Sequence, residues 1–226
     1  MMLDLFDQFS SPNMLGLPLM TIALLTPTAL MYTNQRLQPS RLTATQSYIA
    51  WTFTKHLFHP INKPGHAWAL MLLTTMAYLL MINLLGLLPH IFTPTTQLAL
   101  NMGLAVPLWT MTVLLGLRTN PAASLAHMLP LGTPGPLIPA LILIETVSLL
   151  IRPLALGVRL TANLTAGHLL MTLISLTALK MLSLAPPIAI LTTTLLALLA
   201  CLELAVAIIQ AYVFTLLVSL YLQENT

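Results

Sequence analysis

Seven polar residues in the C-terminal half of the sequence stand inside long apolar runs, where they could carry chemistry. They are Glu145, Arg152, Arg159, Asn163, His168, Glu203 and Gln210. An ionisable side chain at membrane depth costs about 2.5–3.5 kcal/mol on insertion scales, so each charge is a functional candidate. Carboxylates and imidazole can exchange protons, whereas guanidinium stays charged at any pH that a protein meets.

One stripe of a predicted long helix carries three of these charges. Residues seven apart nearly eclipse each other on an α-helix. Glu145, Arg152 and Arg159 have this spacing, and Asn163 follows one turn later. His168 comes nine residues after Arg159 and therefore points to roughly the opposite face.

Arg159 can act only as a fixed positive charge, which attracts a carboxylate and repels protons. At 4 Å and an effective dielectric constant near 20, two unit charges interact by about 4 kcal/mol before desolvation is subtracted. A barrier of this kind needs a titrating partner that moves past it. The alternative is a static salt bridge to Glu145 or Glu203, since two acids and two arginines balance.

Small residues flank the arginine stripe at Ala155, Ala162 and Ala166. Small side chains let a second helix approach closely in a membrane. The sequence therefore predicts a smooth partner surface around Arg159. The alternative is that these alanines pack against the chain's own helices.

His168 and Glu203 can both titrate and are expected near the outer side of the membrane, on two adjacent helices. We expect them to form a polar pathway from outside, with Glu145 serving a second pathway inward. Gln210 shares the helix face of Glu203. A histidine in a membrane is often only a structural hydrogen-bonding group. A His/Glu pair could also bind zinc, but two ligands are a weak signal, and no metal site is predicted.

The composition identifies lipid as the solvent of this chain. Of its 226 residues, 58% are hydrophobic and 6% are charged, whereas a soluble domain has about 25% charged residues. We expect one membrane domain, with no room for a separate soluble one. No Lys/Arg cluster indicates a nucleic-acid surface, and the single Cys201 excludes an internal disulfide.

Hydropathy predicts an all-α polytopic protein with about five transmembrane helices. The expected spans are about 14–33, 67–88, 98–117, 137–180 and 187–222. A straight helix over 137–180 would be about 66 Å long, twice a bilayer core. Two spans joined by a tight turn are the alternative, but no polar cluster interrupts the run. We expect a steeply inclined helix, kinked near Pro153, and an antiparallel hairpin that turns near Ala185.

The segment 37–62 mixes basic residues with aliphatic and aromatic ones, which is typical of an amphipathic helix in the membrane interface. A polar loop is the alternative. Basic residues gather between the first two spans and at Arg118, so we expect the N-terminus outside and the C-terminus inside. No basic residue precedes Arg36, which fits neither a secretory n-region nor an Arg-rich transit peptide.

The residues 145–168, in the pattern E-x6-RP-x5-R-x3-N-x3-GH, resemble the signature of subunit a of F-type ATP synthases. The segments 83–89, 92–97 and 203–214 resemble further signatures of the family, so the resemblance covers essentially the whole chain. The Leu-, Thr- and Met-rich composition resembles the animal mitochondrial form.

The resemblance implies a stator channel beside a rotating ring of c subunits, each with a buried carboxylate. Protons would enter by one half-channel past His168 and Glu203 and leave by another past Glu145. Arg159 would separate the two, with Asn163 and Gln210 beside it. Arg152 would be a supporting residue.

The resemblance also implies a multi-pass protein of the mitochondrial inner membrane, with its N-terminus in the intermembrane space and its C-terminus toward the matrix. The ring, a peripheral stalk and small membrane subunits would be its partners, in a lipid bilayer. The chain would not be catalytic alone and would need no cofactor.

Two other functions remain open from the residues. One is a stand-alone proton-coupled secondary transporter, although no second copy of the 145–168 pattern is found. The other is a structural scaffold, in which the buried charges would serve no purpose.

Overall fold

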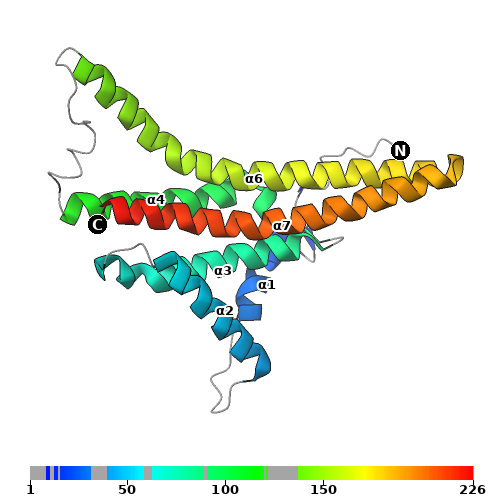
Figure 1. The fold of residues 1–226 in the computed structure, drawn as a ribbon, viewed down its shortest axis with the longest axis horizontal. Helices are drawn as coiled ribbons and strands as arrows, with labels where there is room; N and C mark the ends of the chain where they lie inside the picture. Colours follow the sequence, from blue (N-terminus) through cyan, green and yellow to red (C-terminus); the bar gives the residue numbers. More distant parts are fainter. Residues whose placement is uncertain are drawn as a thin grey trace. The chain divides into compact units, whose positions relative to one another are not determined.

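The computed structural model describes residues 9–10, 13–14, 16–31, 40–58, 63–88, 91–119, 121 and 137–225 (Figure 1). Its α-helices are α1 (Leu19–Met31), α2 (Arg41–Phe58), α3 (Ala69–Gly86), α4 (Leu98–Thr119), α6 (Ile138–Leu184) and α7 (Pro186–Asn225). Two short 3₁₀ helices, η2 (Lys63–Trp68) and η3 (Pro94–Thr96), precede α3 and α4. The predicted all-α class is confirmed, apart from two strands of two residues each, β1 (Asn13–Met14) and β2 (Leu17–Pro18).

Four helices in the described ranges are long and apolar enough to cross a membrane. They cover His66–Gly86, Leu98–Thr119, Ile138–Leu184 and Pro186–Gln223. These agree with the last four predicted spans to within a few residues. Hydropathy finds them reliably because a bilayer core of about 30 Å needs about 20 consecutive apolar residues in a helix.

The first expected span is shorter in the structure than the sequence predicts. α1 has 13 residues, which is about 20 Å of helix. The residues before it are extended, with Asn13 paired to Pro18 and Met14 paired to Leu17. Gly16 lies in the turn at a φ of 81°, which glycine adopts without strain. The hairpin therefore takes up apolar residues that the hydropathy pattern assigns to a helix.

α2 shows that the middle of the segment 37–62 is helical and not a polar loop. Residues 37–39 and 59–62 lie outside the described ranges. Tyr48 and Trp51 are 68% and 61% exposed, and the Lys55 ammonium lies 5.3 Å from the centre of the Trp51 ring. A position in the membrane interface stays a prediction.

α6 is one continuous helix of 47 residues, which rules out two spans with a tight turn between them. At ~1.5 Å per residue it is about 70 Å long, and it runs through Pro153 without a break. The kink expected there stays a prediction. Only Ala185 separates α6 from α7, at the turn that the sequence predicts.

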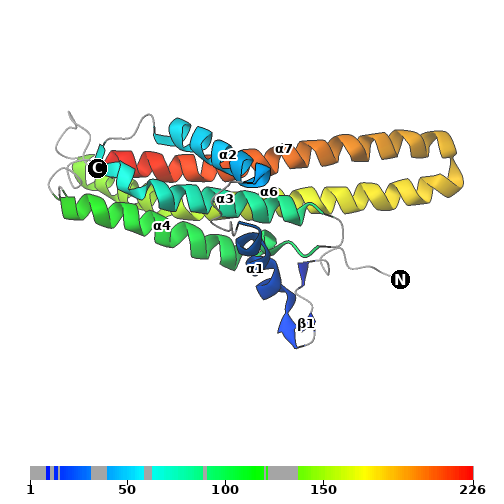
Figure 2. The same ribbon diagram turned by 90° about the horizontal axis from the view of Figure 1, so that it is seen from below.

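The turn satisfies the ends of both helices with few residues. Ala185 N–H donates to the Met181 carbonyl, and the Ala185 carbonyl accepts from the backbone of Ile188 and Ala189. Pro186 and Pro187 open α7, where their missing N–H groups cost nothing. Figures 1 and 2 show the yellow part of α6 and the orange part of α7 side by side as they approach this turn.

The described helices contribute to two compact units. The first consists of Met1–Tyr32, Ala77–Leu98 and Arg159–Tyr212. Its core contains Leu79, Ile82 and Leu160, each at most 1% exposed. This unit holds the turn and five of the seven polar candidates.

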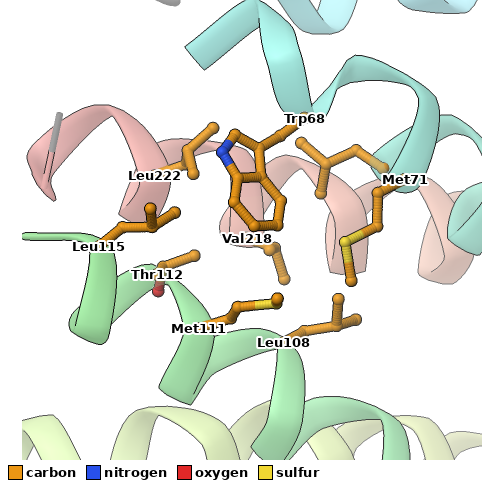
Figure 3. A pocket seen from close by; sticks show the side chains of 9 residues that line it. Trp68, Met71, Leu108, Met111, Thr112, Leu115, Val218 and Leu222 are labelled. Atoms are coloured by element: carbon orange, nitrogen blue, oxygen red, sulfur yellow. The ribbon is translucent and has the colours of Figure 1, made fainter. Parts of the chain in front are cut away.

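The second unit consists of Thr33–Met76, Ala99–Val158 and Val213–Thr226. It has a small, almost entirely apolar pocket of about 20 Å³. Figure 3 shows the Trp68 indole there, beside Leu222 and Met71 and across from residues of α4. A cavity of this size and lining has too few polar partners to hold ordered water.

Candidate functional site

His168 on α6 and Glu203 on α7 lie together inside the first unit, as the sequence predicts for two helices of a hairpin. His168 Nε2 is 3.9 Å from Glu203 Oε1. The Glu203 residue is 5% exposed, and the His168 side chain is 21% exposed. Within the described residues, neither carboxylate oxygen of Glu203 nor His168 Nε2 has a hydrogen-bond partner. Buried polar atoms in proteins are normally hydrogen-bonded, so the pair remains a candidate for proton exchange.

A second cross-helix contact joins Asn163 and Gln210. Asn163 Nδ2 donates a hydrogen bond of 3.0 Å to Gln210 Oε1. Gln210 is 7% exposed, whereas Asn163 lies on the exposed side of α6. From the Asn163–Gln210 contact to the His168–Glu203 contact, residue numbers rise on α6 and fall on α7. The two helices are therefore antiparallel.

Arg159 is exposed, and in the described part of the chain it makes no ion pair with Glu203. Ala162 and Ala166, which lie within two turns of it on α6, are exposed as well. Ala155, in the other unit, is also exposed. Exposure of the three alanines favours the partner surface over packing against the chain's own helices, and the partner surface stays a prediction. Arg159 stands on a face of small side chains that is open to a partner.

Glu145 pairs with Arg152, one of its neighbours on the predicted stripe. Glu145 Oε1 is 3.5 Å from Arg152 Nη2, with side chains 38% and 29% exposed. The Arg152 guanidinium also lies 5.3 Å from the centre of the Tyr221 ring on α7. These contacts belong to the second unit. Arg152 thus contacts both an acid of its own helix and an aromatic ring of α7, and its supporting role stays a prediction.

Asn83 and Tyr221 are two polar residues that were not among the predicted site residues. Asn83 is 1% exposed, and its Nδ2 donates a long, 3.5 Å hydrogen bond to the Ala207 carbonyl. Ala207 lies one turn from Glu203 on α7. An amide in the last turn of the apolar helix α3 was the available signal for Asn83. The Arg152–Tyr221 contact depends on side-chain positions and left no such signal.

Known proteins are similar to this chain over almost its whole length. The model of the family described as ATP synthase A chain matches residues 14–223. The chain belongs to the ATP synthase A chain family. The match to the ATP synthase A chain model includes all seven polar candidates, and it confirms the resemblance seen in the residues.

Individual vertebrate members of the ATP synthase A chain family are close in sequence. The ATP synthase F(0) complex subunit a of Struthio camelus is 62% identical over all 226 residues and covers the full length of both chains. Proteins of the same name from Tetraodon nigroviridis and Salmo salar are 61% and 58% identical, again over the full length of both chains.

Proposed function

We propose that this chain is the stationary proton-channel subunit of the membrane sector of a mitochondrial ATP synthase. It lies in the inner membrane, with its N-terminus in the intermembrane space and its C-terminus toward the matrix. It works beside a ring of c subunits and is held by a peripheral stalk and small membrane subunits. The names of its vertebrate relatives support this role in the F(0) complex.

The observation that carries the proposal is the state of Arg159. It is an exposed cation among small exposed side chains on an apolar helix, and it has no ion pair with Glu203, the carboxylate in the described part of its unit. A charge left open in this way at membrane depth needs a carboxylate from outside the chain. A ring subunit that carries a buried carboxylate supplies such a partner, since a smooth alanine face admits a close helix.

The proton path divides into two offset half-channels with Arg159 between them. Protons enter past Glu203 and His168 and neutralise a ring carboxylate. The ring then turns, and the carboxylate releases its proton past Glu145 to the inner side. The deprotonated carboxylate pairs with Arg159, which cannot accept a proton and so blocks direct leakage. Asn163 and Gln210 keep a neutral polar contact next to this barrier.

A stand-alone proton-coupled transporter is the second candidate. Such transporters are commonly built from repeats with paired broken helices. α6 is unbroken, and the 145–168 pattern occurs once in the sequence. A protein that conducts protons without a ring would favour this candidate.

Replacing Arg159 in the assembled complex tests the proposal. In vesicles with an imposed proton gradient, Arg159→Ala should lower ATP synthesis by about 100-fold or more, because the fixed charge is lost. Arg159→Lys keeps the charge but not the planar fork, so it should recover only part of the rate. Lys180→Ala removes an exposed cation from the same helix and is the matched control. ATP synthesis by Arg159→Ala at the control's rate would refute the rotary channel.

A further inference from the structure

Gly167 on α6 lies against the carboxylate of Glu203 on α7. A Cβ atom at Gly167 would be 2.5 Å from Glu203 Oε1, 2.9 Å from Cδ and 3.4 Å from Cγ. The first two distances are shorter than side chains tolerate, so no other amino acid fits without a shift. The Glu203 carboxylate therefore occupies the space that a side chain at position 167 would fill.

Within the described residues, no hydrogen bond fixes this carboxylate. Neither oxygen has a hydrogen-bond partner there, and His168 Nε2, at 3.9 Å, is beyond hydrogen-bond range. Glu203 is nevertheless buried, with only 5% of its surface exposed. Its position relative to His168 therefore depends on packing, and the absence of a Cβ at Gly167 leaves the space that the carboxylate occupies.

We propose that Gly167 is a positioning residue for proton entry, which admits the Glu203 carboxylate to the backbone of α6 and so sets its distance from His168. This role rests on the proposed function, in which Glu203 and His168 take part in proton entry. Gly167 touches no proton itself and acts through Glu203.

A methyl group at this position should disturb function more than folding. The atoms that it meets are the far end of a flexible side chain and not a helix backbone. The carboxylate can retreat by roughly 1 Å to reach ordinary van der Waals contact, while α6 and α7 stay in place. A misplacement of this size in a catalytic arrangement can cost about 100-fold in rate.

The test compares two helical glycines in the assembled complex. Gly167→Ala should lower proton flux through reconstituted vesicles by about 10- to 100-fold, with normal amounts of complex. Gly103→Ala on α4 is the matched control, because a Cβ there meets nothing within 4 Å. Equal flux in the two variants would overturn the positioning role.

Shortening Glu203 separates positioning from packing. In a Glu203→Asp background, adding Gly167→Ala should lower proton flux by less than about twofold. The reason is that the shorter acid no longer reaches the position of the new Cβ. If Gly167→Ala lowers proton flux as much in the Glu203→Asp background as in the unmodified chain, the proposal is overturned.

The thermal stability of the assembled complex gives a second readout that does not depend on flux. Gly167→Ala should leave it unchanged in a Glu203→Ala background, and a loss there would assign Gly167 to helix packing instead.

The two proposals fail in different ways. Full ATP synthesis by Arg159→Ala refutes the channel itself. If Arg159→Ala abolishes ATP synthesis but Gly167→Ala gives the same proton flux as Gly103→Ala, only the role of Gly167 is refuted.

Discussion

The amide of Asn163 donates a 3.0 Å hydrogen bond to Gln210 and thereby joins α6 to α7. Glu203 lies two turns from Gln210 on α7, and Arg159 lies one turn from Asn163 on α6. A neutral contact is therefore interposed between the fixed cation and the titratable pair. Because amides neither gain nor lose protons near neutral pH, this contact can separate the two without adding charge.

The Asn163–Gln210 bond should contribute measurably to the stability of the hairpin. Asn163→Ala leaves the buried amide of Gln210 without this partner, which should cost about 1–3 kcal/mol. Thermal unfolding of the full chain in detergent measures the loss. Ser183→Ala removes an exposed polar group whose hydroxyl bonds only its own helix, and it serves as the control. A loss no larger than that of the control would mean that the bond contributes nothing.

Ala162 should be critical for association with a ring and dispensable for folding. It is exposed on the Arg159 side of α6, so Ala162→Phe adds bulk where a partner helix must approach. We expect loss of ring subunits on co-purification, while the full chain keeps its thermal stability. Leu182→Phe enlarges a position of α6 that is 65% exposed and lies on the opposite face from Ala162, and it serves as the control. Normal recovery of the ring with Ala162→Phe would contradict the partner surface.

Gly86 should be a packing position whose replacement destabilises the first unit. A Cβ there would be 2.8 Å from Thr93 Cγ2. Thr93 is 7% exposed, and its carbonyl accepts a 2.7 Å bond from Thr96 Oγ1. Overpacking of this kind costs about 1–3 kcal/mol, visible in thermal unfolding.

A compensating change identifies the cause of that loss. Thr93→Ser removes the Cγ2 methyl and should restore most of the stability of Gly86→Ala. If the double variant is no more stable than Gly86→Ala, the contact with Thr93 is not the cause.

The long helices could be predicted from the sequence, but the start of the chain could not. α6 and α7 are so apolar over such length that no soluble arrangement competes. Near the N-terminus, hydropathy counts an apolar residue equally whether it is extended or helical. The hairpin there follows from Gly16 and Pro18, which are local breakers that a window average does not register.

The main contacts across the hairpin could be predicted because the turn sets their register. His168 is 17 residues before Ala185, and Glu203 is 18 residues after it, so an antiparallel pair brings them to the same level. The spacing also groups Glu145 with Arg152, and the structure pairs them. The close approach at Gly167 could not be foreseen, because it depends on the rotamer of Glu203 and on the separation of two helix backbones.

A turn of one residue makes the hairpin intolerant of changes in length. Inserting a single residue between Pro186 and Glu203 would rotate Glu203 by about 100° and advance it by about 1.5 Å. Gln210 would rotate with it, so the contacts with His168 and Asn163 would be lost together. The turn at Ala185 thus sets the register of both polar contacts, although Ala185 takes part in neither.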